Sequence, residues 1–207
     1  MDQNTRKKLI KEFSKLYPNP ESELFFKNEY ELVIAVALSA QCTDKKVNEV
    51  TPYLFKKYPD FKELSKARVA SVEKIIKEVN YYRNKSKYII SMAKRVVEEF
   101  NSKLPKTHKE LTSLAGVGRK TANVVLSELG IEPTFPVDTH VFRLSHRLGL
   151  SNAKTTDLVE EDMKKLFNSK LWRNLHHYLI LHGRRVCKAQ NPNCSECEIS
   201  RICPSKQ

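Results

Sequence analysis

Two glycines placed two residues apart, Gly116 and Gly118, constrain the fold of this chain more than any other feature. An apolar pattern typical of a helix precedes them over residues 107–114, and another follows from Ala122 to Gly130. Glycine permits a positive φ and lets another backbone come close, so the pair predicts a tight turn between two helices. The first backbone N–H groups of the second helix lack partners within that helix. Its N-terminus is therefore suited to an anion such as phosphate.

The remaining sequence predicts an all-α fold. Apolar residues recur at spacings of three and four, and no run alternates with a period of two for long enough to predict a strand. We expect helices over residues 4–17, from near Asn28 to Leu38, from Thr43 or Asp44 to about Phe55, after Lys85 to about Phe100, over 107–114, from the glycine turn to Gly130, from Thr139 to Gly149, and around 158–167 and 171–182. Short helices are expected to open near Asp60 and at Ser71. Pro52 must kink or restart the third of these helices, and the sequence does not decide between the two. Asn28 with Glu31 resembles a capping box.

Charge and composition indicate the kind of partner and compartment. The chain has 37 basic and 24 acidic residues, a net charge of +13, which favours a polyanionic partner although many proteins carry such an excess unused. The N-terminus lacks the apolar segment of a signal peptide, and no run approaches the ~18 apolar residues of a membrane span. We therefore expect a cytoplasmic protein with reduced cysteines and no membrane association.

Four of the five cysteines lie in the last 21 residues, with the spacing C-x6-C-x2-C-x5-C. In a reducing compartment this clustering indicates a metal site rather than disulfides. Structural zinc usually has two closely spaced cysteine pairs, whereas only one such pair occurs here, so both an iron–sulfur cluster and zinc stay open. The four are Cys187, Cys194, Cys197 and Cys203. Cys42 is expected to be a packed residue, and His176, His177 and His182 to be core or surface residues.

Two residues are candidates for catalysis. Lys120 lies in the first turn of the helix that follows Gly118. There the helix N-terminus and Arg119 disfavour a positive charge and so favour a nucleophilic amine. Pairing of Lys120 with a phosphate is an equally good interpretation. Asp138 precedes Thr139 and His140 and makes a good helix N-cap, or it is a carboxylate that stabilises a positive charge or shuttles a proton.

Tyr81 and Gln41 have a functional interpretation beside the ordinary one. Both are common residues in turns or at helix ends. Next to a DNA groove, however, such side chains can wedge into the base stack and hold open the space of an extruded base.

Together these features resemble the endonuclease III family of DNA glycosylases, within the helix-hairpin-helix superfamily. The resemblance covers nearly the whole chain. Its carriers are the segments 38–44, 82–85, 116–124, 137–141 and 179–183 and the four cysteines. In this order and spacing they are very specific.

The resemblance implies two helical domains with the active site in a cleft between them. Residues 22–132 would form a six-helix domain containing the hairpin, and residues 1–21 plus 133–207 would form a domain in which the four cysteines hold a [4Fe-4S] cluster. The protein would be a monomer, associated with the nucleoid through DNA.

The resemblance also implies a reaction in base excision repair, by a DNA glycosylase that is also an abasic-site lyase. Lys120 would attack C1′ of an extruded nucleotide, the base would leave, and β-elimination would cut the strand 3′ to the lesion, with Asp138 as the catalytic aspartate. The partner would be double-stranded DNA containing oxidised pyrimidines or abasic sites. The implied DNA-binding residues are Gln41, Tyr81, Gly116, Val117, Gly118, Arg119 and His140.

Three positions depart from the family pattern. Ala115 stands where the family often has proline, and Asn80 where it usually has glycine. Asparagine tolerates a positive φ, so we expect the turn at Asn80 to persist. The loop between Cys187 and Cys194 has Lys188 as its only basic residue.

Three other functions compete with this one. A monofunctional glycosylase, such as the adenine-mismatch enzyme, generally lacks a lysine at position 120 and carries a further C-terminal domain. A DNA-binding module without enzymatic activity would use the hairpin only to clamp phosphate, and would not cleave at an abasic site. An iron–sulfur electron carrier would have no need of the hairpin.

Overall fold

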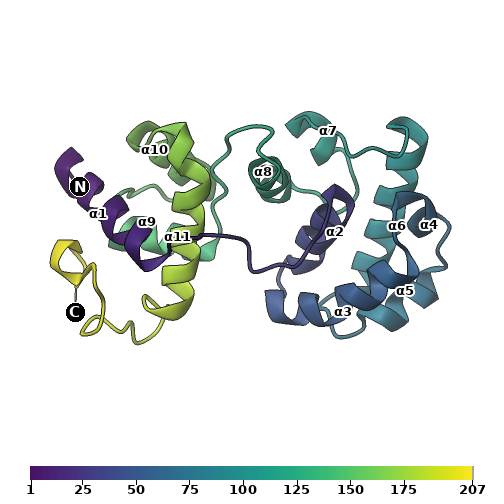
Figure 1. The fold of residues 1–207 in the computed structure, drawn as a ribbon, viewed down its shortest axis with the longest axis horizontal. Coiled ribbons are helices and arrows are strands. Elements are labelled where there is room, and N and C mark those ends of the chain that lie inside the picture. Colours follow the sequence, from purple (N-terminus) through teal and green to yellow (C-terminus); the bar gives the residue numbers. More distant parts are fainter. Residues whose placement is uncertain (207) are drawn as a thin grey trace. The chain divides into compact units, whose positions relative to one another are not determined.

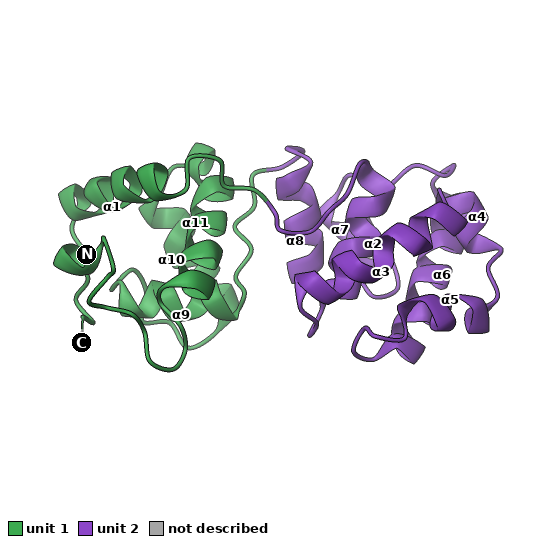
Figure 2. Ribbon diagram, turned by 60° about the horizontal axis from the view of Figure 1, so that its bottom comes forward, with its two compact units in different colours: residues 1–21, 133–207 green, residues 22–132 purple. Residues whose placement is uncertain are grey.

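The structure, a computed structural model, describes residues 1–206. These residues form eleven α-helices and two short 3₁₀-helices, and no strand occurs among them (Figure 1). The all-α prediction is thus confirmed. The chain divides into two compact units, which are coloured separately in Figure 2: unit 1 is Met1–Glu21 with Pro133–Gln207, and unit 2 is Ser22–Glu132. No helix in the described part is long and apolar enough to cross a membrane.

Unit 2 is built around one helix that is buried on every side. Its helices are α2 (Glu29–Ser39), α3 (Asp44–Lys57), α4 (Phe61–Ser65), α5 (Val69–Ile76), α6 (Tyr82–Glu99), α7 (His108–Thr112) and α8 (Arg119–Glu128). The run from Leu32 to Leu38 in α2 is buried, as its uninterrupted apolar sequence requires. The described residues of this unit thus form seven helices, where the resemblance implies six.

Local capping explains where many of these helices begin. Asn28 accepts a hydrogen bond from the N–H of Glu31 at 2.9 Å, and the Glu31 carboxylate accepts one from the N–H of Lys27 at 2.7 Å. This is close to the predicted capping box, except that Glu31 reaches one residue further back. Thr107 and Asp60 cap α7 and α4 in the same way, each satisfying an N–H that the helix itself leaves unpaired.

Two boundaries differ from the predicted ones. α3 continues as one helix through Pro52, so the proline does not restart it. α5 begins at Val69, with Arg68 as its N-cap residue, and not at Ser71. The N–H of Ser71 bonds to the carbonyl of Arg68 at 2.9 Å, which closes the first turn ahead of the serine.

Unit 1 combines the two ends of the chain. Its helices are α1 (Gln3–Leu16), α9 (Thr139–Arg147), α10 (Thr156–Leu166), α11 (Trp172–Arg185) and the 3₁₀-helices η1 (Ser169–Leu171) and η2 (Ser200–Ile202). Phe13 of α1 is fully buried and stacks on Tyr178 of α11, with ring centroids 5.7 Å apart. The N-terminal helix is therefore part of the same core as the C-terminal one.

A buried lysine fixes the end of α2. The Lys85 Nζ donates to the carbonyl oxygens of Leu38 at 2.9 Å and Ala40 at 2.6 Å. Burial lowers the pKa of Lys85, and the nearby Cys42 opposes this effect. Without Lys85, the buried carbonyl of Leu38 and the part-buried carbonyl of Ala40 would lose this hydrogen-bond donor.

We expect Lys85→Met to lower the free energy of unfolding by about 1–3 kcal/mol, because the buried carbonyl of Leu38 and the part-buried carbonyl of Ala40 lose their donor. Urea denaturation of the full chain measures the change. Lys87→Met is the control, since Lys87 lies on the same helix and is exposed. Equal stability of the two variants would contradict the assignment.

Candidate functional site

The turn between α7 and α8 needs one of its two glycines for its conformation. Gly116 has φ +79°, in the left-handed region, and a Cβ built on it would lie 3.1 Å from the Cβ of Tyr88. Gly118 has φ −85° and ψ 177°, which any residue can adopt, so only Gly116 of the pair uses the positive φ that glycine permits. Val117 between them is 4% exposed and packs into the core of unit 2. Its side chain anchors the turn instead of facing a ligand.

Gly118 leaves open space at the start of α8. It is the N-cap residue, no side chain caps the helix, and a Cβ built on it would meet nothing within 4 Å. Arg119 and Lys120 are the first two residues of the helix, and both are exposed. The N–H groups of the first turn point away from the helix beside these basic side chains. This arrangement suits a phosphate that comes close to the backbone.

Gln41 and Tyr81 lie on one cavity with the hairpin glycine. The cavity has a volume of about 230 Å³, and its lining includes Gln41, Tyr81, Tyr88 and Gly116. Gln41 has φ +54° and Tyr81 has φ +60°, both unusual for residues other than glycine. The turn at Asn80 persists, as expected, closed by a bond from the N–H of Tyr82 to the carbonyl of Val79 at 3.1 Å. Its left-handed residue is Tyr81, the next one along the chain, and not Asn80.

Asp138 is the N-cap of α9, which confirms that part of its prediction. Its Oδ1 accepts a hydrogen bond from the N–H of Val141 at 2.8 Å. This bond uses one of two carboxylate oxygens, and the residue is half-exposed. A second role for the carboxylate is therefore compatible with its role as a cap.

Arg143 connects α9 to the residues that open the cysteine loop. Its Nη2 donates to the carbonyls of Gly183 at 2.9 Å and Cys187 at 3.0 Å, and lies 3.2 Å from the Nδ1 of His140. Burial lowers the pKa of His140, Asp138 opposes this effect, and Arg143 and Arg184 add to it. His140 therefore favours its neutral form, as a polar group rather than a cation.

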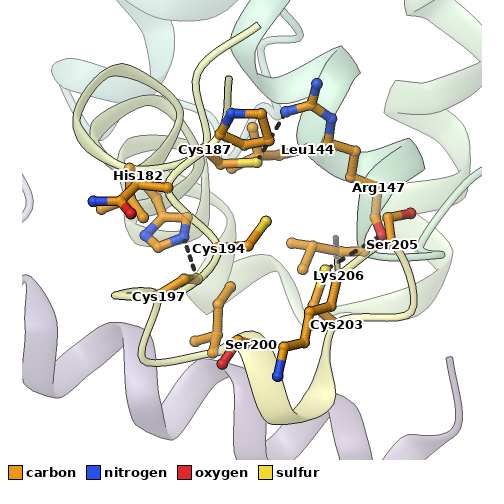
Figure 3. A pocket seen from close by; sticks show the side chains of 15 residues that line it. Leu144, Arg147, His182, Cys187, Cys194, Cys197, Ser200, Cys203, Ser205 and Lys206 are labelled. Atoms are coloured by element: carbon orange, nitrogen blue, oxygen red, sulfur yellow. Dashed lines mark hydrogen bonds between the residues drawn. The ribbon is translucent and has the colours of Figure 1, made fainter. Parts of the chain in front are cut away.

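The four C-terminal cysteines line one cavity in unit 1. It has a volume of about 200 Å³, and Figure 3 shows the cysteines around it together with His182, Arg147 and Leu144. Burial raises the pKa of the Cys197 and Cys203 thiols, because a buried thiolate loses its hydration. A cation bound among them would reverse this preference. No group of three or more His, Cys, Asp or Glu in residues 1–206 converges closely enough to hold a single metal ion.

Two residues that support the cysteines were not predicted. Arg147 donates to the Sγ of Cys187 at 3.3 Å and to the carbonyls of Lys188 and Ala189 at 2.7 and 2.9 Å. His182 lies between two groups: its Nδ1 is 3.0 Å from the hydroxyl of Tyr17, and its Nε2 is 3.4 Å from the Sγ of Cys197. No sequence signal identifies Arg147.

His182 is 1% exposed, which confirms a core position for it, and burial lowers its pKa to about 4, although Glu198 opposes the effect. The neutral ring can therefore donate through one nitrogen and accept through the other. The only hint in the sequence was its position five residues before the first cysteine.

The chain matches known proteins over most of its length. Residues 34–169 match the family described as HhH-GPD superfamily base excision DNA repair protein. An endonuclease III from Synechocystis sp. is 44% identical over 194 residues, covering 93% of this chain and 89% of the relative.

Solved structures give the same result. A non-covalent endonuclease III–DNA complex superposes with a TM-score of 0.94 at 37% identity, covering 100% of this chain and 97% of the other. A trapped covalent endonuclease III–DNA intermediate, with an estranged adenine, superposes with a TM-score of 0.93 at 38% identity over the same shares.

The two hairpin glycines should respond differently to substitution. We expect Gly116→Ala to lower the free energy of unfolding by about 1–2 kcal/mol, since an L-residue at φ +79° is strained and its Cβ meets Tyr88. Gly118→Ala should leave stability nearly unchanged. Urea denaturation of both variants tests this. An equal loss of stability in the two variants would show that position 118 does not have room for a Cβ.

Proposed function

The chain belongs to the endonuclease III family and to the HhH-GPD superfamily of base excision DNA repair proteins, and we propose that it is a bifunctional DNA glycosylase and abasic-site lyase acting on oxidised pyrimidines. The observation that carries the lyase activity is the placement of Lys120, exposed in the first turn of α8 beside the open backbone of Gly118. An amine at this place lies next to the position proposed for a phosphate of the bound strand.

Lys120 is the proposed nucleophile. Its uncharged Nζ attacks C1′ of the damaged nucleotide, and the bond from C1′ to the base breaks, so that the base leaves with a proton. The sugar ring opens to an imine on Lys120. Removal of a C2′ proton then breaks the bond from C3′ to its oxygen, which cuts the strand 3′ to the lesion. Water finally hydrolyses the imine and frees the lysine.

Asp138 is the proposed carboxylate of this reaction. Loss of the base places positive charge on the sugar, and a carboxylate stabilises that charge or carries the proton that the lysine gives up. The N-cap bond to Val141 supports this role, because it holds one oxygen and fixes the orientation of the group. The cap and the catalytic role therefore use the same side chain.

Double-stranded DNA is the proposed partner, bound in part by the hairpin. The net charge of +13 and the uncapped N-terminus of α8 support phosphate binding there. Gly116 and Val117 would contribute through the turn they build, and Gly118 and Arg119 through the backbone and charge at the helix start. His140, neutral and half-buried, would contribute as a hydrogen-bonding group.

Gln41 and Tyr81 are proposed to enter the base stack. Extruding a base costs a few kcal/mol, less for a damaged base, and side chains that fill the vacated space offset part of that cost. Both residues are exposed and both have a left-handed backbone, and non-glycine residues with this strain concentrate at functional sites.

The cavity between the four cysteines fits an iron–sulfur cluster better than zinc. A zinc ion needs all four sulfurs about 2.3 Å from one point. In a [4Fe-4S] cluster each cysteine binds a different iron, so its ligands surround a volume. Four cysteines that surround a cavity of about 200 Å³ support the cluster.

Bound there, such a cluster would act as a structural crosslink of the C-terminal loop. Thiolate Cys197 can only accept a hydrogen bond, so the Nε2 of His182 would carry the proton and Tyr17 would donate to Nδ1.

Borohydride trapping tests Lys120. The protein should form a covalent adduct with duplex DNA that contains one thymine glycol, and Lys120→Ala should form none while still binding the DNA. Lys94→Ala is the control, since Lys94 is an exposed lysine of the same unit. An adduct in the Lys120→Ala variant would contradict the assignment, and no adduct with the wild type would favour a monofunctional enzyme or a binding module.

Two substitutions separate the roles of Asp138. Asparagine caps helices as well as aspartate does, so Asp138→Asn should keep its stability but excise the base about 100-fold or more slowly. Asp138→Ala should lose that rate and also about 1 kcal/mol of stability. Single-turnover excision and urea denaturation measure the two effects. Normal turnover by Asp138→Asn would leave the residue only its role as a cap.

Cys197→Ser tests the cofactor. The variant should lose bound iron and acid-labile sulfide, together with the visible absorption of the cluster, and should unfold more easily. Cys42→Ser is the control, since Cys42 packs against the core of unit 2 and should not affect metal content. Elemental analysis that finds stoichiometric zinc without sulfide in the wild type would contradict the cluster.

A further inference from the structure

Two loops of unit 2 present the residues proposed to enter DNA, and each is held in a strained conformation. The loop after α2 carries Gln41 at φ +54°, and the loop before α6 carries Tyr81 at φ +60°. For a residue other than glycine this conformation costs about 1–2 kcal/mol. It persists only where neighbouring groups hold it.

The side chain of Asn80 joins the two loops. The amide Nδ2 of Asn80 donates to the carbonyl oxygen of Gln41 at 2.7 Å, across 39 residues of sequence. The adjacent carbonyl of Ala40 is held by Lys85 at 2.6 Å, and the N–H of Cys42 bonds to the carbonyl of Ser39 at 3.0 Å. Of these bonds, the Asn80 amide acts directly on the strained residue.

The loop that carries Asn80 is itself fixed. The N–H of Lys85 bonds to the carbonyl of Tyr81 at 3.0 Å, and the N–H of Tyr82 bonds to the carbonyl of Val79 at 3.1 Å. The Asn80 side chain therefore reaches from the hydrogen-bonded loop before α6 to the loop after α2, which has fewer hydrogen bonds of its own. Gln41 and Tyr81 both line the same cavity, and the Asn80 amide links the loops that carry them.

We propose that Asn80 is a positioning residue that holds Gln41 in its left-handed conformation before DNA binds, so that Gln41 enters the duplex beside Tyr81 without a further ordering cost. The inference rests on the proposed function, because it assumes that Gln41 enters the base stack. A loop fixed in its bound conformation loses less entropy on binding, which gives Asn80 an effect on base extrusion although its side chain need not touch the DNA.

The test is a double-mutant cycle on DNA binding. The probe is a duplex with one tetrahydrofuran, a stable abasic analogue, next to a 2-aminopurine whose fluorescence reports unstacking. Asn80→Ala should weaken binding about 3- to 10-fold, the value of one hydrogen bond, and reduce the fluorescence change. Asn152→Ala, which alters an exposed asparagine of unit 1, should do neither.

The cycle then asks whether Asn80 acts through Gln41. In a Gln41→Ala background the further loss from Asn80→Ala should fall to less than about 2-fold, because the side chain that Asn80 positions is gone. If the two substitutions together weaken binding by the product of their separate effects, the proposal is overturned, since Asn80 would then contact DNA itself or only stabilise the fold. Thermal denaturation checks that the Asn80→Ala and Asn152→Ala proteins are equally folded.

Activity separates this inference from the proposed function. Single-stranded abasic DNA has no partner strand to displace, so Asn80→Ala should cleave it at the wild-type rate. Wild-type protein that unstacks the probe but forms no imine would refute the lyase activity and leave the role of Asn80 intact. Wild-type cleavage with an Asn80→Ala variant that binds the duplex equally well would refute the role of Asn80 alone.

Discussion

The buried amine of Lys85 is the interaction on which the candidate site in unit 2 depends. α2 is apolar on every side, so it can only be buried, and the carbonyl of Leu38 near its end is buried with it. A buried carbonyl without a donor costs about 1–3 kcal/mol, and Lys85 satisfies two at once. Because α6 supplies this amine, the same contact fixes the loop that carries Gln41 relative to the loop that carries Tyr81.

In unit 1, arginine side chains satisfy backbone carbonyls that have no partner in a helix. The segment from Val186 to Ile199 contains no helix, so its backbone groups have few partners of their own. Arg143 and Arg147, both on α9, bind four different carbonyls at the end of α11 and the start of this loop. The planar guanidinium suits this task because it offers several donors in a fixed arrangement. The cysteines thus extend from a loop whose first residues are already held.

Local chemistry made part of the structure predictable. The hairpin turn, the caps at Asn28 and Asp138 and the buried α2 follow from residues that lie within a few positions of one another. The contacts of Lys85 with Ala40, of Arg147 with Ala189 and of His182 with Tyr17 do not, because packing brings these residues together from segments 40 or more residues apart. The left-handed residue of the turn is Tyr81, one position after Asn80, the residue whose type tolerates a positive φ. The catalytic roles of Lys120 and Asp138 rest on the resemblance rather than on local pattern, and stay predictions.

Because unit 1 is built from both ends of the chain, its helices are synthesised at very different times. Unit 2 is one continuous stretch and can fold once its last residues leave the ribosome. α1 is made first, but its partner α11 is made last: Tyr17 and His182 are 165 residues apart. At about 5–20 residues per second, α1 waits roughly 10–30 s for α11. During that time its apolar face, with Leu9 and Phe13, has no place to bury. The N-terminal helix therefore lacks its partner until nearly the whole chain has been made.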